Sequence, residues 1–233
     1  MAKYEIKDGV GIIPEGTKEI ESEAFMECTD LTSIIIPSTV MEIGAHAFSG
    51  CTGLTNISIP DSVTEIGEAA FSGCMGLTSI TIPQMVTTVR DSAFKDCESL
   101  ESVILGKSVM TIEHWAFLYC SSLKSIIFGK KLKKIDEMAF RGCTGLTELI
   151  IPKSTTSIGF GAFMECTGLT SVTAERVKRV EDHTFDGCSN LTSAYFPMAM
   201  YVGFGAFRNC TSLVKVSLCP IREIEGSAFD NCP

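Results

Sequence analysis

The sequence is poor in the residues from which enzymes build active sites. Only three histidines occur in 233 residues, and no local motif joins one of them to a nucleophile and a carboxylate. Gly159–Gly161 and Gly203–Gly205 are repeat positions, and no phosphate-binding loop or dinucleotide-binding fingerprint is present. We therefore expect a non-enzymatic protein with no catalytic residue, no metal and no cofactor, and we interpret His114 and His183 as solvated surface side chains.

An excess of positive charge and long apolar runs are also missing. The net charge of −9 argues against nucleic-acid binding, which requires a basic face. The hydrophobic content is 45% and the mean hydropathy is +0.26, but polar residues interrupt every apolar stretch. No segment is then long enough to insert into a membrane. The first four residues contain no apolar signal core, so a signal sequence is absent from this chain.

One short unit is repeated along nearly the whole chain. Phenylalanine recurs at a constant spacing from Phe25 through Phe48 to Phe163, and at a spacing shorter by a single residue from there to Phe229. Ten of the eleven cysteines keep step with these phenylalanines along the chain. A period of roughly 22–23 residues is typical of solenoids, in which each unit buries its apolar face against its neighbours. We predict a single domain over residues 1–233, with the repeats, about ten in number, in residues 13–233.

Each repeat begins with a predicted strand. In the repeat at residues 54–76, apolar and polar residues alternate from Leu54 to Ile59, as in a strand with one buried face. Pro60 ends this strand because proline has no N–H to donate to a ladder. Since every repeat supplies one such strand, we expect a parallel sheet along the length of the solenoid.

The second half of each repeat has a helical period. Val63, Ile66, Ala70, Phe71 and Cys74 fall on one face when they are placed at about 100° per residue. This spacing predicts a short helix or 3₁₀ turn over residues 67–74, opposite the sheet. A segment this short is not stable alone, so stacking of the phenylalanines must hold it.

The phenylalanine and cysteine columns form the predicted core. We expect Phe117 to be enclosed by Phe94 and Phe140. The wide spacing of the cysteines, one in each repeat, does not match the short ligand pairs of zinc sites. We therefore interpret the ten column cysteines as reduced, buried and hydrophobic. Cys219 lies outside this column and is expected to be the most accessible thiol.

The two ends of the chain are expected to differ. Residues 1–12 alternate around Asp8-Gly9, which predicts a hairpin that covers the first coil. The other end stops at residues 231–233 in phase with the repeat and has no evident C-terminal cap. We expect either a piece of a longer array or a last coil that a partner covers, with weak self-association through the C-terminal coil.

The repeat Leu-x-x-Ile-x-Ile-Pro, followed by Val-x-x-Ile-Gly-x-x-Ala-Phe-x-x-Cys, closely resembles the BspA-like leucine-rich repeat, also called the Treponema pallidum type. The resemblance covers Ile13 to Cys232. It implies a curved, right-handed α/β leucine-rich-repeat solenoid. It also implies an extracellular or cell-surface protein used for adhesion, whose partner is another protein such as a host extracellular-matrix or surface protein. The family supplies no catalytic residues.

Two groups of variable apolar residues are candidates for a binding surface. The outward-facing strand positions include Ile104, Ile127, Ile150 and Tyr195, of which the three isoleucines would form an exposed strip. The alternative is that β-branched residues simply suit a sheet. The predicted helical side carries a second cluster of aromatic residues and methionine, which are typical interface anchors. Its members are Trp115, Leu118, Tyr119, Met138, Phe160 and Met164, of which Trp115, Tyr119, Met138 and Phe160 are the candidate binding residues. The alternative for this cluster is packing against neighbouring side chains.

A local basic edge is a third feature. It contains Lys107, Lys130, Lys131, Lys133, Lys134 and Lys153. In an acidic chain such an edge would suit an acidic partner, or it is a solvated turn face. Together these features favour a protein-binding, adhesin-like scaffold. The alternative is a structural spacer or an engineered repeat scaffold without a native ligand, which should be polar on every face.

Overall fold

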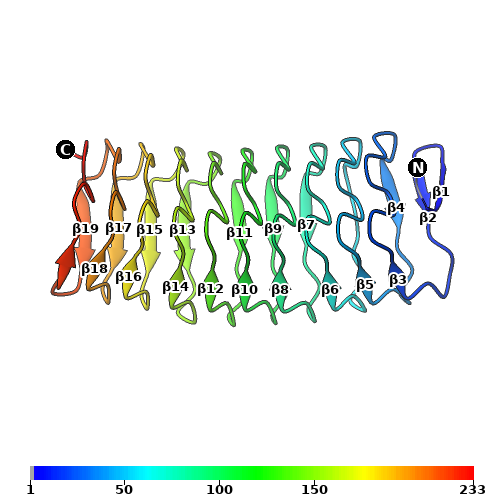
Figure 1. Ribbon diagram of the computed structural model, residues 1–233, viewed down its shortest axis with the longest axis horizontal. Helices are drawn as coiled ribbons and strands as arrows, with labels where there is room; N and C mark the ends of the chain where they lie inside the picture. The colour runs from blue at the N-terminus through cyan, green and yellow to red at the C-terminus, as the bar shows by residue number, and fades with distance from the viewer. Residues whose placement is uncertain (1–2) are drawn as a thin grey trace.

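The computed structural model describes residues 3–233 as an elongated stack of coils (Figure 1). The coils follow one long axis from the N-terminal hairpin to the C-terminal end. A typical coil contains a first strand, a turn, a second and shorter strand, and an arc of tight turns that leads to the next coil.

The first strands of successive coils are parallel, as predicted. Residues one repeat apart lie opposite each other; for example, Ser125 lies opposite Ser102. Along each strand, inward-facing residues are buried or partly buried and outward-facing residues are more exposed. The strands are β4 (Ser33–Ile35), β7 (Ser79–Thr81), β9 (Ser102–Ile104), β11 (Ser125–Ile127), β13 (Glu148–Ile151), β15 (Ser171–Ala174), β17 (Ser193–Phe196) and β19 (Lys215–Leu218).

A second column of strands was not predicted. Each of these strands has two residues, and except in β20 the second residue is buried in the core. Two residues are too few for a period of two to be distinguished from a helical pattern. The strands are β3 (Glu19–Ile20), β5 (Glu42–Ile43), β6 (Glu65–Ile66), β8 (Thr88–Val89), β10 (Thr111–Ile112), β12 (Lys134–Ile135), β14 (Ser157–Ile158), β16 (Arg179–Val180), β18 (Tyr201–Val202) and β20 (Glu223–Ile224).

The predicted helix at residues 67–74 is wrong, and residues 3–233 contain no helix. This segment is an arc of turns in which Ala69 (φ 50°) and Gly73 (φ 72°) are left-handed. A left-handed residue at every fourth position interrupts a right-handed helix. Alternate amides bond between coils, as where the N–H of Phe71 donates to the carbonyl of Ala93 at 2.9 Å. The amides between them close single turns, as where the N–H of Ser72 donates to the carbonyl of Ala69 at 3.1 Å.

Stacked phenylalanine rings run through the core. Consecutive rings from Phe25 to Phe229 are nearly parallel, with centroids 5.1 to 5.6 Å apart. Phe117 lies between Phe94 at 5.3 Å and Phe140 at 5.1 Å, which confirms the expected enclosure. Because each ring is shared between neighbouring coils, the column couples each coil to the next.

The cysteine column lies beside the rings. Eight of its ten thiols are buried, and a typical one, Cys120, donates from Sγ to the carbonyl of Phe94 at 3.1 Å. The prediction of complete burial is wrong for Cys28 and Cys232, which are half-buried because they lie in coils near the two ends. Cys219 is also half-buried, and no disulfide joins cysteines within residues 3–233.

The N-terminal segment continues both the sheet and the ring stack. Strands β1 (Glu5–Lys7) and β2 (Val10–Ile12) are antiparallel, and β2 pairs in parallel with β4. Asp8 (φ 52°) and Gly9 (φ 79°) form the connecting turn, with the two positive φ angles of a type I′ hairpin. Tyr4 stacks on Phe25 at 5.5 Å.

The ladder of first strands has two interruptions, which divide it into three sheets. The first skips residues 54–60, where the outward-facing side chains of Asn56 and Ser58 are poor strand formers. The second falls between β11 and β13. Both of these segments form strands and both are rich in β-branched residues, so strand propensity does not explain the second interruption.

Candidate functional site

The outward face of the first strands carries the predicted isoleucine strip. Ile104, Ile127 and Ile150 are 43%, 60% and 63% exposed. Ile104 and Ile127 lie opposite each other in the ladder, and Ile150 is the equivalent residue of the following coil, across the second interruption. Tyr195 is also exposed, but Thr173 separates it from Ile150. The structure therefore brings the three isoleucines together and leaves Tyr195 apart.

A depression of about 540 Å³ lies where the strip meets the turns that follow β9 and β11. Exposed or half-buried Ile104, Ile127 and Phe128 supply apolar surface, and buried Leu105 lies beneath. Lysine side chains surround the depression, so the structure joins two features that the sequence presented separately. The lysines are Lys107, Lys130 and Lys131.

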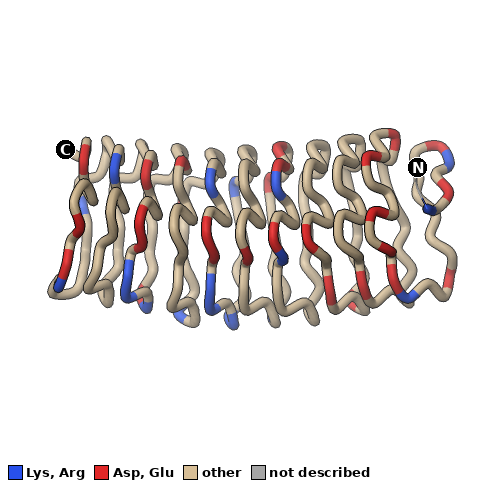
Figure 2. The backbone as a smooth tube through the Cα atoms, in the orientation of Figure 1, with Lys and Arg blue, Asp and Glu red and all other residues tan. Residues whose placement is uncertain are grey.

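These three lysines have no carboxylate within 4.0 Å among residues 3–233, unlike other lysines nearby. Lys124 pairs with Glu101 at 2.9 Å, and Lys153 pairs with Glu175 at 2.9 Å. Figure 2 shows several lysine and arginine positions along the lower edge of the C-terminal half of the stack. The depression thus combines apolar surface with unneutralised positive charge in a chain whose net charge is −9.

The side chain of Phe128 explains why the ladder is interrupted between β11 and β13, an interruption that we call the opening of this coil. It occupies a column that is otherwise mostly isoleucine and leucine, and Leu132 of the same coil occupies a column that is mostly valine. Ile126 and Phe128 are half-buried, whereas Leu105 and Ile151, the residues equivalent to Phe128 on either side, are buried. An overfilled core displaces side chains and backbone outward. We attribute the interruption between β11 and β13 to this excess volume.

The backbone records the same opening. The N–H of Leu105 donates to the carbonyl of Ile127 at 2.9 Å, and the N–H of Ile82 donates to the carbonyl of Ile104 at 2.8 Å. The equivalent N–H of Phe128 finds no backbone acceptor within residues 3–233. The Phe128 ring meets Phe140 edge-on at 6.2 Å, so it still contacts the core.

The aromatic cluster lies on the arc of turns, not on a helix. Trp115, Tyr119 and Met138 occupy left-handed positions, with φ of 55°, 58° and 51°. Sequence reasoning missed this conformation, although glycine at equivalent positions such as Gly161 and Gly142 was a signal for it. A side chain is costly there, yet the column of Trp115 also holds residues as different as Glu23, Ala69 and Gly161, so the coil imposes the left-handed backbone while the side chain varies.

The members of this cluster are anchored to their neighbours. Trp115, Tyr119 and Phe160 are exposed and Met138 is half-buried. The guanidinium of Arg141 lies over the Tyr119 ring at 5.8 Å, and Phe160 meets His183 edge-on at 5.4 Å. The cluster is therefore spread over several coils and partly engaged within the chain.

His183 is not the solvated side chain that was expected. Its Nδ1 lies 3.0 Å from Oδ2 of Asp186, which is buried and also accepts hydrogen bonds from Arg208 and Asn209. Burial alone would raise the pKa of Asp186, but the hydrogen bonds from Arg208 and His183 lower it overall. This network is satisfied internally and contains no nucleophile.

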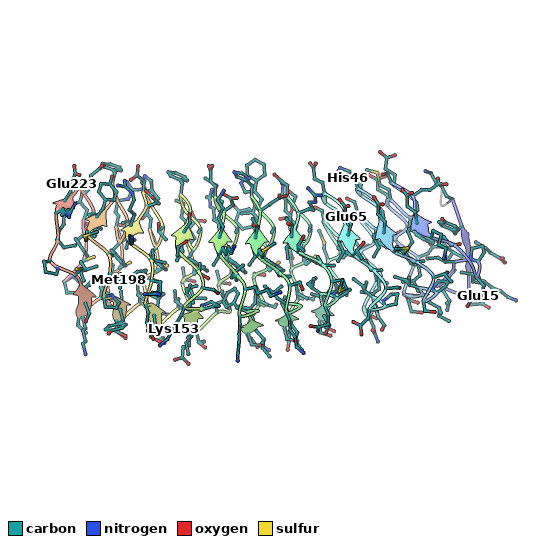
Figure 3. The ribbon with its side chains drawn as sticks, turned by 90° about the horizontal axis from the view of Figure 1, so that it is seen from below. Glu15, His46, Glu65, Lys153, Met198 and Glu223 are labelled. Carbon is teal, nitrogen blue, oxygen red and sulfur yellow. The ribbon has the colours of Figure 1, made fainter. Side chains whose placement is uncertain are left out.

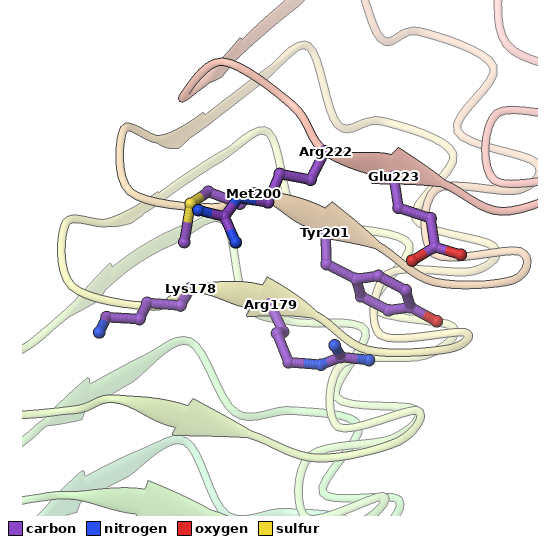
Figure 4. A pocket seen from close by; sticks show the side chains of 6 residues that line it. All are labelled: Lys178, Arg179, Met200, Tyr201, Arg222 and Glu223. Carbon is purple, nitrogen blue, oxygen red and sulfur yellow. The ribbon is translucent and has the colours of Figure 1, made fainter.

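A second depression, of about 290 Å³, lies on the second-strand column near the C-terminal end (Figure 4). The guanidinium of Arg179 stacks on Tyr201 at 3.6 Å and pairs with Glu181 at 3.1 Å. A hydrogen bond to Glu225 raises the pKa of Tyr201 to about 12. The sequence analysis missed this site because three repeats contribute to it, through strands that were not predicted.

The N-terminal half of the second-strand column is acidic. Glu19, Glu42 and Glu65 lie opposite one another in successive coils, and a depression of about 360 Å³ lies beside them. Burial raises the pKa of Glu42, and the charges of Glu19 and Glu65 add to this shift. In Figure 3, Glu65 and Glu223 lie toward one edge of the stack and Lys153 toward the other.

Within residues 3–233, no group of three or more His, Cys, Asp or Glu side chains is arranged to hold a metal ion. The same residues contain no helix with the length and apolar character needed to cross a bilayer.

Comparison with known proteins agrees with the repeat and the fold. A family model described as BspA type leucine rich repeat region, with six copies, matches residues 18–147 and 111–233. A leucine-rich repeat protein of T. pallidum is 31% identical, with 78% of each chain covered and a TM-score of 0.59. One from Bacteroides ovatus is 27% identical, with 94% of this chain and 75% of that chain covered and a TM-score of 0.58.

A leucine-rich repeat protein from Eubacterium ventriosum shares the fold at 22% identity, with 94% of this chain and 81% of that chain covered and a TM-score of 0.51. No curated protein matches the chain. The period, the parallel strands, the family model and the solved structures all indicate one architecture, a right-handed leucine-rich-repeat solenoid. The chain belongs to the BspA-type leucine-rich repeat family.

Proposed function

We propose that this chain is a non-enzymatic, adhesin-like, protein-binding scaffold from a cell-surface or secreted protein. Its binding surface is the outward face of the first strands over β9, β11 and β13. The resemblance of the repeats to the BspA-like family supports the surface origin, and the class of partner is a host extracellular-matrix or surface protein.

The single observation that carries the proposal is the isoleucine strip. Ile104, Ile127 and Ile150 expose apolar side chains on the same face of successive coils, next to a depression with an apolar floor. Contiguous exposed apolar surface of this kind marks interaction sites, whereas single exposed apolar residues are ordinary. A structural spacer would need no such strip.

A binding assay with a matched control tests this proposal. The purified chain is titrated over immobilised fibronectin, laminin and collagen by surface plasmon resonance. We expect saturable binding to at least one of them and an affinity at least about tenfold lower for Ile127→Lys. Ile35→Lys changes an isoleucine of the same column that is even more exposed and lies far from the depression, and it should leave the affinity unchanged.

Failure to bind any of these proteins would contradict the adhesin-like role, and an equal loss in both variants would contradict the location of the surface. Self-association through the C-terminal coil is a separate prediction. In that coil Val216 and Leu218 are half-buried and Ile224 is exposed. Sedimentation velocity over a range of concentrations tests it, and concentration-independent monomer would contradict it.

A further inference from the structure

The depression beside the isoleucine strip has a chemical character that narrows the kind of partner it fits. We propose that it binds an extended acidic peptide segment of a partner protein, with an apolar side chain of that segment on Ile127 and Phe128 and carboxylates on the lysines. This inference rests on the proposed function and specifies the partner of the same surface.

The floor of the depression is apolar and accessible to solvent. Ile104 and Ile127 are exposed and Phe128 is half-buried, because the overfilled coil holds the ring partly outside the core. An apolar side chain placed in this depression would remove these surfaces from water, which is favourable in proportion to the area covered. A depression of about 540 Å³ has room for one or two side chains but not for a folded domain.

The rim of the depression is positively charged. Lys107, Lys130 and Lys131 line the same depression and have no acidic partner within 4.0 Å among residues 3–233. An exposed ammonium group that is already paired contributes little to a new partner, but these three are available. A partner with carboxylates spaced along an extended chain matches them, and a basic partner is repelled.

Most of the remaining surface opposes an acidic ligand. The depression lined by Lys178, Arg179 and Arg222 also carries positive charge, but it contains Glu223 and its Arg179 is already paired with Glu181 at 3.1 Å. The net charge is −9, and the depression beside the N-terminal half of the second-strand column is lined by four glutamates and one aspartate, with Arg90 as its one cation, paired with Glu65 at 2.7 Å. An acidic segment would be repelled from that surface and would find its complement at the lysine rim. A basic segment should prefer the glutamate-lined depression instead.

Fluorescence anisotropy with two dye-labelled peptides tests the inference. One peptide alternates glutamate and leucine, and the other has glutamine in place of every glutamate. We expect the full chain to bind the glutamate peptide at least about tenfold more tightly, and this preference to decline as salt is raised from about 50 to 500 mM. Equal affinity for the two peptides would overturn the proposal.

Charge reversal locates the site. The double variant Lys130→Glu with Lys131→Glu should lose at least about tenfold in affinity for the glutamate peptide. The control variant Lys133→Glu with Lys178→Glu makes the same change in net charge outside the depression and should lose less than about threefold. Equal losses in the two double variants would mean that only net charge matters, and would overturn the proposal.

The two proposals fail in different ways. If Ile127→Lys weakens matrix-protein binding but the Lys130 and Lys131 reversal does not, the surface binds protein and the acidic partner is wrong. If the glutamate peptide binds in a lysine-dependent way while no matrix protein binds, the acidic site stands and the adhesin-like role is wrong.

Discussion

Phe128 and Phe196 occupy the same column of the repeat and have opposite environments. Phe196 is fully buried, edge-on to Phe185 at 5.7 Å and Phe207 at 6.3 Å. Phe128 is half-buried and meets only Phe140, at 6.2 Å. The ladder continues through β17 on both sides of Phe196, whereas it is interrupted between β11 and β13 beside Phe128.

The difference comes from the neighbouring core positions. Around Phe196 the repeat places alanine at Ala174, Ala194 and Ala199, all of them buried. At the positions around Phe128 that correspond to these three, the sequence has Leu105, Ile126 and Leu132. A close-packed interior accepts a larger side chain only when a neighbour becomes smaller. The comparison indicates that excess volume in one coil interrupts the ladder between β11 and β13 and leaves apolar surface exposed there.

Alkaline unfolding should show no difference between the coils of Phe128 and Phe196 at the cysteine column, because the two coils differ only on the side of their first strands. Burial raises the pKa of the column thiols, to about 12 for Cys51, Cys166 and Cys210, from 9.0. The folded state thus holds its thiol protons longer than the unfolded state, so stability is complete below pH 9 and is lost as the pH rises toward 12. Each thiol contributes a slope of about 1.4 kcal/mol per pH unit to the free energy of unfolding.

The eight buried thiols act in the same direction, so the slope of the free energy of unfolding against pH should become steeper above pH 9. Urea titrations at several pH values measure it. Since Cys143 of the open coil and Cys188 near Phe196 are equally buried, Cys143→Ala and Cys188→Ala should reduce the slope equally. A smaller reduction for Cys143→Ala would show that the opening reaches through the coil.

Truncation of the two phenylalanines should separate them by stability. Phe196→Ala should cost about 3–5 kcal/mol, as should Phe117→Ala in the ring stack, because both side chains are fully buried. Phe128→Ala should cost only about 1–2 kcal/mol, since part of its surface already faces water. Urea denaturation measures all three, and equal costs for Phe128 and Phe196 would contradict the account.

Overfilling the balanced coil should reproduce the open one. Ala194→Leu adds volume beside Phe196 and should cost about 1–3 kcal/mol. Amide exchange in β17 should become faster, as the ladder between β15 and β17 opens. Ser193→Thr changes the adjacent outward-facing residue and is the control. If Ala194→Leu leaves β17 as protected as in the parent, core volume does not control the ladder.

Relieving the overfilled coil should have the smallest effect on stability. Leu132→Val restores the residue that is common in its column, and the relief of crowding should offset the lost apolar contact, so the free energy of unfolding should stay close to that of the parent. Leu146→Val removes the same volume from a column that is leucine in every coil and should cost about 1 kcal/mol. Thermal unfolding compares the two variants, and an equal loss would argue that the coil of Phe128 is not crowded.

Much of the fold could be predicted because each core column is repeated along the chain. The position of Phe117 between Phe94 and Phe140 follows from the constant spacing of the phenylalanines alone. The second strands and the left-handed positions could not be predicted from periodicity, because two-residue strands and single positive φ angles produce no period of their own. Glycine at Gly73 and Gly142 was the available signal for the turn arc.

The candidate site was predicted only in part. The alternation in each strand was enough to expect Ile104, Ile127 and Ile150 on the outside, because outward positions are fixed by the pleat. The depression beside them depends on whether the side chains of Phe128 and Leu132 fit together inside one coil. A periodic pattern of apolar residues does not show how much volume the interior of a coil can hold. Sequence reasoning treated the strip and the lysine edge as separate for the same reason.

Amide exchange at Phe128 tests the central claim, that an overfilled coil opens the sheet beside the candidate binding site. Leu105, one coil earlier, supplies the matched comparison, because its N–H donates to Ile127 at 2.9 Å. Native-state exchange followed by NMR should show the Phe128 amide at least about 100-fold less protected than that of Leu105. Leu132→Val should reduce this difference in protection between the two amides. Equal protection of the two amides in the parent protein would contradict the account.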